Sequence, residues 1–208
     1  MSGNFSRRAV IGLGLGALAV LAGCGSAWMT SYEPVGASAK DWRLAGVDVT
    51  VPETLSVSED NTVYVPKADI VWQGEPFGDR RAQVARLLRE GITHGAAGLN
   101  GKQRVRFRVT LQTFHALNEK SRRSAPAGTG VYDIRYTIEV VDARNGAVIV
   151  PAQAVAADFP GQTGTAATQM EARGITQRVQ VVGHLAATTA GWLGLGPDNR
   201  TSFARIGG

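Results

Sequence analysis

The stretch RVRFRVTLQTFH, Arg104 to His115, decides the fold because its apolar and polar residues alternate without interruption as far as Gln112. This alternation is typical of a strand with one buried face. Phe114 breaks the alternation, which predicts a bulge or the end of the strand nearby. The apolar residues expected on the buried face are Val105, Phe107, Val109 and Leu111.

A second alternating segment, Tyr132 to Val140, leads into the dipeptide Asn145-Gly146. Asn-Gly between two apolar segments is a strong hairpin signal, because both residues tolerate the positive φ of a tight turn. The return strand is expected over Ala147 to Phe159. Pro151 places a strand edge or a bulge within it.

Outside this hairpin, the pattern predicts an earlier strand around Val47 to Val51 and a helix on each side of the hairpin. Asp79 is a good N-cap for the first helix, which Asn100-Gly101 ends. The second helix is expected from a capping box at Thr168 to Glu171 as far as Leu193. Asn118 to Gly130 is expected to be a long polar connection.

These elements predict the order β-α-β-β-β-α and an α+β fold. We expect a two-layer sandwich in which a mostly antiparallel sheet of four to five strands carries both helices on one face. Residues 42–193 would form a single domain. Residues 24–41 would be a flexible tether, and residues 194–208 a loose C-terminal tail.

The N-terminus has the composition of an export signal. Arg7 and Arg8 precede an apolar run, Ala9 to Ala22, that is shorter than the ~20 residues a membrane-spanning helix needs. The run ends in Leu21-Ala22-Gly23-Cys24, which contains the only cysteine of the chain. Cleavage by an ordinary signal peptidase near residues 25–27 is the alternative interpretation, and twin-arginine export is a second option.

Leu21 to Cys24 resembles the lipobox of bacterial lipoproteins. The resemblance implies that residues 1–23 are a signal peptide cleaved between Gly23 and Cys24, and that Cys24 carries the lipid. Gly25 stands where an aspartate would favour retention in the inner membrane, so the resemblance implies the periplasmic side of the outer membrane. The partners we expect are a membrane, through the lipid, and another envelope protein.

Charge and cysteine content limit the remaining functions. Without the two arginines of the leader, the chain has 20 basic and 17 acidic residues, a net charge of +3. This mild excess, together with export, gives no reason to expect nucleic acid as a partner. With Cys24 acylated, the domain would fold without a disulfide.

Arg104, Arg106 and Arg108 form one candidate site, because strand alternation places them on one face. They could bind an anionic ligand, or they could pair with Asp133, Glu139 or Asp48 on a solvated sheet face.

Asp69, Glu75 and Asp79 surround Trp72 and could form a carbohydrate-type acid–base site. Acidic residues in a Gly/Pro-rich turn are more often helix caps and turn formers. The sequence has no nucleophile motif and no phosphate-binding loop in the domain.

The three histidines, His94, His115 and His184, are far apart in the sequence, so we expect no metal site and no cofactor.

From Trp42 onward the chain resembles a family of uncharacterised lipoproteins of alphaproteobacteria, a domain of unknown function. The segments that carry the resemblance are Val51-Pro52, Leu55-Ser56-Val57, Ala68 to Trp72, Gly74-Glu75-Pro76, Gly78-Asp79-Arg80, Phe114 to Leu117, Asp142-Ala143, Thr176-Gln177 and His184. No motif among them is tied to an activity.

We therefore expect a non-enzymatic envelope lipoprotein that docks on, or assists, an assembly or transport complex. A lipid- or amphiphile-binding domain, with a cavity between sheet and helices, is the alternative. A carboxylate-based hydrolase using Asp69, Glu75 and Asp79 is the third hypothesis.

Overall fold

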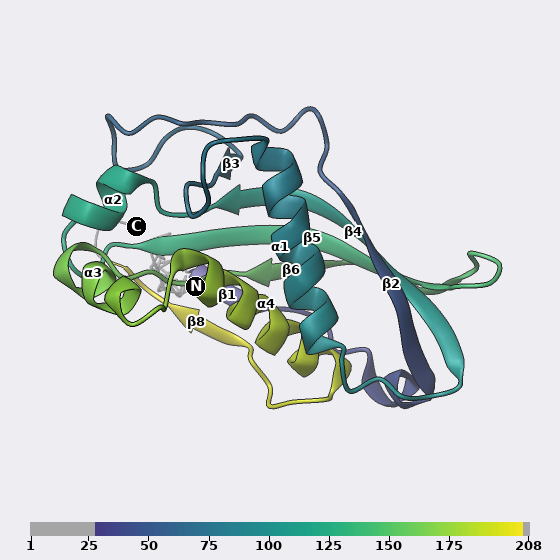
Figure 1. Ribbon diagram of the computed structural model, residues 1–208. Coiled ribbons are helices and arrows are strands. Elements are labelled where there is room, and N and C mark those ends of the chain that lie inside the picture. The colour runs from purple at the N-terminus through teal and green to yellow at the C-terminus, as the bar shows by residue number, and fades with distance from the viewer. Residues whose placement is uncertain (1–27, 206–208) are drawn as a thin grey trace, which may run out of the picture.

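The computed structural model describes residues 28–205. The predicted signal peptide, with Gly23 and Cys24, and residues 206–208 lie outside the described residues. Two long helices cross one face of a single open sheet of eight strands (Figure 1). The elements are β1 Trp28–Ser31, η1 Gly36–Asp41, β2 Trp42–Thr50, β3 Ile70–Val71, α1 Arg80–Gly95, β4 Gln103–His115, α2 Glu119–Ser124, β5 Val131–Asp142, β6 Val148–Ala157, β7 Phe159–Pro160, α3 Gly164–Ala172, α4 Gln177–Leu193 and β8 Thr201–Phe203.

The two longest strands, β4 and β5, pair antiparallel at the centre of the sheet. Phe107 lies opposite Val140 and Val109 opposite Ile138, so the predicted apolar face is continuous across both strands. The register shifts between Leu111 and Thr113, which is the bulge that Phe114 predicts. Gly146 adopts a φ of 75° in the turn between β5 and β6, as the Asn-Gly dipeptide predicts.

The sheet differs from the prediction in size and in strand direction. Its order is β2-β4-β5-β6-β1-β8, with β3 also beside β4 and β7 beside β5, so it has more than the four to five strands expected. Both β2 and β3 run parallel to β4. The parallel pair arises because α1 carries the chain back across the face of the sheet between β2 and β4, as parallel strands require.

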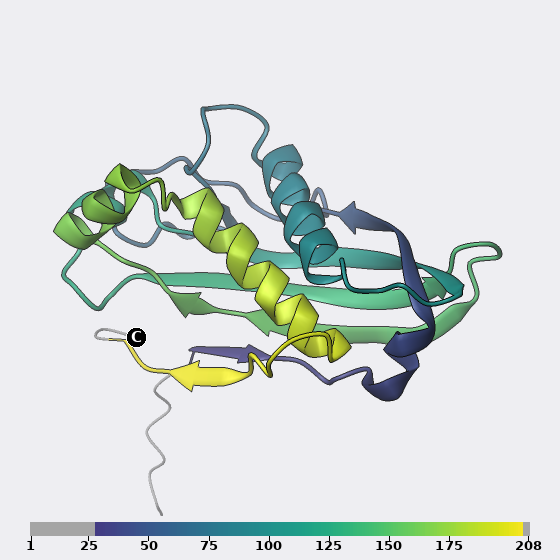
Figure 2. The same cartoon turned by 60° about the horizontal axis from the view of Figure 1, so that its bottom comes forward.

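Helices α1 and α4 lie side by side on one face of the sheet, as expected (Figures 1 and 2). Asp79 caps α1 by accepting a hydrogen bond from Ala82 N at 3.0 Å. A Cβ on Gly91 would lie 2.5 Å from Leu185 Cβ, so the two helix backbones approach more closely than an alanine would allow. The largest fully buried side chains between helices and sheet include Trp42, Trp72, Trp192, Tyr136, Phe107 and Phe114.

The predicted second helix is two helices. The chain forms α3, turns at Gly174 with a φ of 79°, and begins α4 at a new cap, Thr176, whose hydroxyl accepts from Val179 N at 3.3 Å. The polar connection after Asn118 also contains a helix, α2. Asn118 caps it by accepting from Ser121 N at 2.8 Å.

Within the predicted tether and tail, Trp28–Ser31 and Thr201–Phe203 form strands of the sheet, so these two short segments are not the flexible or loose chain expected there. Strand β1 pairs antiparallel with β6, and β8 pairs antiparallel with β1. Tyr32 links the two ends, because its hydroxyl donates to Asp198 Oδ1 at 3.0 Å and accepts from Asn199 N at 2.8 Å. Strands this short satisfy the free hydrogen-bonding groups of the β6 edge but leave no periodic signal in the sequence. Among the helices between residues 28 and 205, none combines the length and apolar character needed to cross a bilayer.

Candidate functional site

The three arginines of β4 lie on the face of the sheet opposite the helices. Arg106 Nε donates to Asp48 Oδ2 at 2.8 Å, and Arg108 Nη1 donates to Glu139 Oε2 at 3.3 Å. The hydrogen bond from Arg106 lowers the pKa of the Asp48 carboxyl. Arg104 is exposed and lies opposite Arg43 on β2. Two of the three charges are therefore matched by carboxylates on neighbouring strands.

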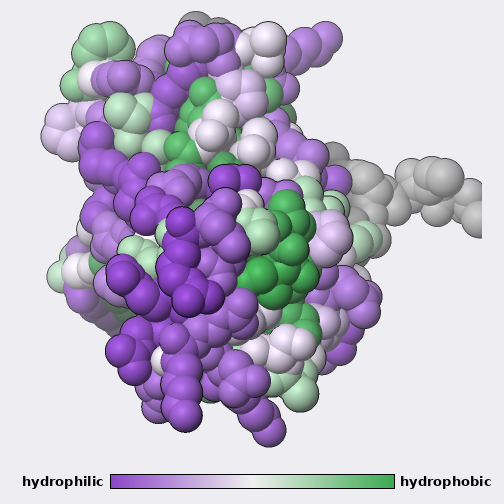
Figure 3. Space-filling view, turned by 90° about the vertical axis from the view of Figure 1, so that its right-hand side faces the viewer, coloured by the Kyte–Doolittle hydropathy of each residue, from purple (hydrophilic) through white to green (hydrophobic). Residues whose placement is uncertain are grey.

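A shallow hollow of about 360 Å³ on this face has a mixed lining that includes Asp48, Arg108 and Glu139. Because charges of both signs border the hollow, its lining does not favour the binding of an anion. Figure 3 looks onto the end of the molecule where β2 and the β5–β6 hairpin lie, and hydrophilic side chains predominate there.

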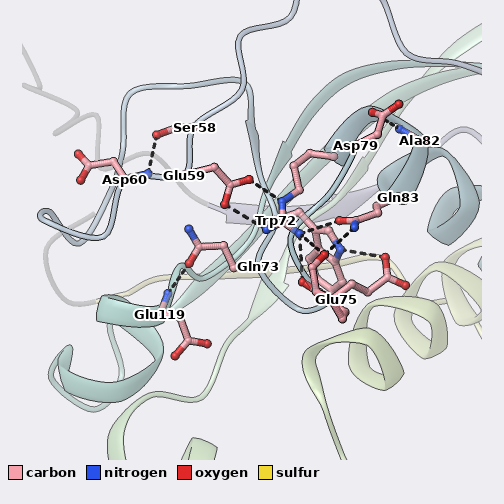
Figure 4. Close-up of polar contacts among 12 residues, drawn as sticks. Ser58, Glu59, Asp60, Trp72, Gln73, Glu75, Asp79, Ala82, Gln83 and Glu119 are labelled. Carbon is pink, nitrogen blue, oxygen red and sulfur yellow. Dashed lines mark hydrogen bonds and ion pairs between the residues drawn. The ribbon is translucent and has the colours of Figure 1, made fainter.

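The three carboxylates around Trp72 have separate partners, and Figure 4 shows those of Glu75 and Asp79. Asp69 accepts from the backbone N and the hydroxyl of Ser56, both at 2.7 Å, and these bonds lower its pKa. Glu75 accepts from Trp72 Nε1 at 3.3 Å, and Asp79 caps α1. None of the three lines either cavity described here. Asp69 and Asp79 are a turn former and a helix cap, whereas Glu75 also pairs with Arg178 Nη1 at 2.9 Å, and the three do not converge on a common space.

The same region holds a buried arginine that the sequence analysis did not single out. The Arg80 side chain is 5% exposed, and its Nη2 donates to Glu59 Oε2 at 3.0 Å while its Nε donates to the other carboxylate oxygen. Its Nη1 donates to Gln83 Oε1 at 2.7 Å and to the carbonyls of Glu75 and Pro76 at 3.0 and 3.1 Å. A bidentate arginine–carboxylate pair with three further acceptors holds the groups bonded to it in a defined geometry.

These contacts fix the turn of residues 74–78 against the start of α1. Gly74 is required there, because a Cβ at this position would overlap the buried Trp72 ring. At the tip of the turn the Phe77 ring is 85% exposed, and it lies 5.7 Å from Arg80 Cζ. Phe77 is the most exposed large apolar residue among those described. The sequence signal for it is a lone aromatic residue between the glycines of a turn.

The three histidines occupy separate places. His94 is exposed on the last turn of α1, and His115 Nε2 donates to Pro66 O at 2.9 Å. His184 Nε2 lies 3.1 Å from the hydroxyl of Thr30. Within residues 28–205, no group of three histidine, cysteine or acidic side chains is placed to hold a metal ion.

A second polar cluster, also missed by the sequence analysis, joins β1 to the loop before β7. The hydroxyl of Thr30 donates to Asp158 O at 2.9 Å, so it accepts from His184 Nε2, which must carry the proton. Burial lowers the pKa of His184 to about 4, so the ring is neutral at pH 7. Burial raises the pKa of Asp158 to about 6, although Met29 N at 3.2 Å donates to the carboxylate and opposes that shift.

The larger cavity, about 380 Å³, lies where β4 ends and β5 begins. Tyr64, Val65, Leu117 and Val131 contribute to a mostly apolar lining. The amphiphile-binding hypothesis requires a cavity between the sheet and the helices, whereas this one lies at an end of the sheet beside α2. The side chains between the sheet and α1 and α4 form the buried hydrophobic core of the domain.

A family model for a family of unknown function, DUF6778, matches residues 42–208. The chain belongs to this family. No curated protein matches it. The DUF6778 domain starts at the first residue of β2 and includes the helices and the rest of the sheet apart from β1.

Solved structures give weaker likenesses. One is a protein from Caulobacter crescentus CB15 that was assigned as a lipoprotein, with 14% identity over 71% of this chain and 90% of that chain, and a TM-score of 0.34. Another is the PelC dodecamer from Paraburkholderia phytofirmans, with 12% identity over 77% of this chain and 98% of that chain, and a TM-score of 0.29.

Proposed function

We propose that this DUF6778 protein is a non-enzymatic lipoprotein of the cell envelope. In this proposal the lipid on Cys24 anchors it to the periplasmic side of the outer membrane, and the domain docks on an envelope assembly or transport complex. The observation that carries the anchor is Leu21 to Cys24, which follows a basic and then an apolar segment. Stable anchoring needs more than one acyl chain, and a lipobox cysteine would supply them.

Metabolic labelling with an alkyne-bearing fatty acid tests the anchor in cells. The wild-type chain should take up the label, and the Cys24→Ser variant should not. Equal labelling of the two chains, or no label on either, would exclude Cys24 as the site of acylation.

The docking step is supported by the turn that carries Phe77. Protein interfaces are enriched in aromatic residues that fill a pocket on the partner. The turn that carries Phe77 is already fixed before binding by the hydrogen bonds from Arg80 to the carbonyls of Glu75 and Pro76. Binding through Phe77 would therefore cost little conformational entropy. A partner that fits this turn would present an apolar pocket to the exposed Phe77 ring.

Crosslinking in cells followed by purification from a detergent extract tests the docking step. Proteins captured by the wild-type chain should be lost with Phe77→Ser and kept with Val148→Ser, a matched control whose side chain is 53% exposed in β6. Capture of the same proteins by all three chains would show that docking does not use the turn.

The hydrolase hypothesis has no comparable support. Asp69, Glu75 and Asp79 have separate partners, so none of them is left as a free acid or base beside a shared cavity. We therefore propose no reaction for this chain.

A further inference from the structure

The cavity beside α2 combines an apolar interior with nitrogen donors that have no acceptor. Its lining comes from the loop of residues 64–68, the end of β4, the segment around α2 and the start of β5. Both ends of the described chain also reach it, through Trp28 and Arg205. Ligand sites are typically mostly apolar cavities of about 300–1,000 Å³ with a few convergent polar groups. At about 380 Å³, this cavity falls in that range.

Two of the lining residues carry a buried N–H group that lacks a partner within the described residues: Trp28 through Nε1 and Arg205 through Nε. A buried donor without an acceptor costs about 1–3 kcal/mol, and native proteins contain few such groups. Both groups are donors and neither is an acceptor. A ligand that presents oxygen acceptors at this place would satisfy both.

The charges around the cavity favour an anion. Lys67 and Arg205 are its cationic lining residues, and Asp133 is its acidic one. Asp133 is already engaged, because Arg135 Nε donates to its Oδ1 at 2.8 Å. The Lys67 side chain is exposed, and no described carboxylate pairs with it or with Arg205. The two cations therefore remain available to an acidic head group.

The apolar part of the cavity sets the form of the ligand. A water molecule occupies about 30 Å³ in the liquid, and at about that volume per methylene the cavity would hold roughly a dozen carbon atoms. Tyr64 and Val65 are 45% and 72% exposed beside it, so apolar surface continues outward for a longer chain. His115 holds this loop in place through its bond to Pro66 O at 2.9 Å.

We propose that this cavity binds one acyl chain of an amphiphile, with an acidic or oxygen-rich head group at Trp28 Nε1, Arg205 and Lys67. The chain could belong to a free lipid or to the acyl group on Cys24, a short distance before Trp28 in the sequence. The second source depends on the proposed acylation, whereas the first does not.

Quenching of tryptophan fluorescence by 2-bromoundecanoic acid tests the proposal, because its bromine stands beside the carboxylate that the proposal places at Trp28 Nε1. The full chain carrying Cys24→Ala is used, because it has no acyl group of its own. Bromine quenches only at short range, and Trp42, Trp72 and Trp192 are at most 2% exposed in the core, so a probe in the cavity reaches Trp28. We expect saturable quenching with a one-to-one stoichiometry, and its loss in Trp28→Phe while native mass spectrometry still detects one bound probe.

Two further variants separate the chain site from the head-group site. Ala68→Phe should fill the cavity and weaken binding at least tenfold, whereas Ala97→Phe, at an exposed alanine outside the cavity, should leave it unchanged. Lys67→Gln, on an exposed side chain that should not affect folding, should weaken binding of the acid several-fold and leave binding of its methyl ester unchanged.

The proposal is wrong if no saturable quenching occurs, if quenching persists in Trp28→Phe, or if Ala68→Phe folds and binds like the wild-type cavity. Equal affinity for acid and methyl ester would overturn the head-group assignment. Native mass spectrometry of the acylated chain distinguishes the sources. One bound probe indicates a site for free amphiphiles. No bound probe, when Cys24→Ala binds one, indicates that the chain's own acyl group fills the cavity.

Discussion

The close contact between α1 and α4 makes a prediction about a single methyl group. A Cβ on Gly91 would lie 2.5 Å from Leu185 Cβ and 3.1 Å from Val182 O, distances at which the α4 backbone itself would have to move. Overpacking of this kind costs about 1–3 kcal/mol, and the contact with Cβ and backbone atoms places Gly91→Ala near the upper end. Alanine regains about 1 kcal/mol of helix propensity. The expected net loss is therefore about 2 kcal/mol.

Gly183 on α4 provides the matched control, because a Cβ there would meet no atom within 4 Å. Gly183→Ala keeps the helix-propensity gain without a clash, so it should stabilise the protein by up to about 1 kcal/mol. The two glycine-to-alanine changes should thus have opposite signs and differ by about 3 kcal/mol.

Equilibrium urea unfolding, followed by circular dichroism, measures both changes in the free energy of unfolding. In a domain of this size, about 1 kcal/mol corresponds to a Tm change of about 2–4 °C, so thermal unfolding gives an independent check. If Gly91→Ala were as stable as Gly183→Ala, the helices would not be held together at the distance described here.

Three further predictions concern buried and exposed charges. Because the native pKa of His184 is about 4 against 6.5 unfolded, the unfolded state takes up the proton first. Stability should therefore fall as pH falls from about 6.5 towards 4, by up to about 3 kcal/mol relative to His184→Gln. The raised pKa of Asp158 acts in the opposite direction, because its protonation stabilises the native state below about pH 6. Both the wild-type chain and His184→Gln contain Asp158, so its effect cancels when the urea unfolding midpoints of the two chains are compared at each pH. Arg80→Ala should cost about 2–4 kcal/mol in urea unfolding, because it leaves Glu59 and three other acceptors without their donor; a loss below about 1 kcal/mol would mean that water replaces the guanidinium. Arg106→Gln, which breaks an exposed pair, should change the free energy of unfolding by less than about 1 kcal/mol, and a larger loss would contradict the surface character of that pair.

The central part of the sheet could be predicted from sequence because its signals are local. The alternation of apolar and polar residues defines β4 and β5, and its interruption at Phe114 marks the bulge. Asn145-Gly146 sets the turn. Strand alternation also placed Arg106 and Arg108 on one face with Asp48 and Glu139 as candidate partners, the contacts that the structure describes.

The edges of the sheet could not be predicted in the same way. Strands β1 and β8 are short and exist through pairing with β6 and with each other, so they have no periodicity of their own. The parallel direction of β2 depends on the path of α1 across the sheet. The break before α4 depends on Gly174, and single glycines also occur inside helices, as Gly183 does.

The polar clusters escaped the sequence analysis because their members are far apart in the chain. Arg80 and Glu59 are 21 positions apart and are joined by an irregular segment without strand or helix periodicity. Trp28 and Arg205, which meet at the cavity, come from opposite ends of the described chain. Residue type predicts that such groups need partners, but only the fold determines which partners they have.

The central claim, a lipid anchor on Cys24, is tested most directly by the mass of the N-terminal peptide from the membrane fraction of cells that make the wild-type chain. We predict that this peptide begins at Cys24 and carries the mass of the attached acyl groups. An unmodified peptide that begins at Ser26 or later would contradict the claim and would indicate a protein released into the periplasm.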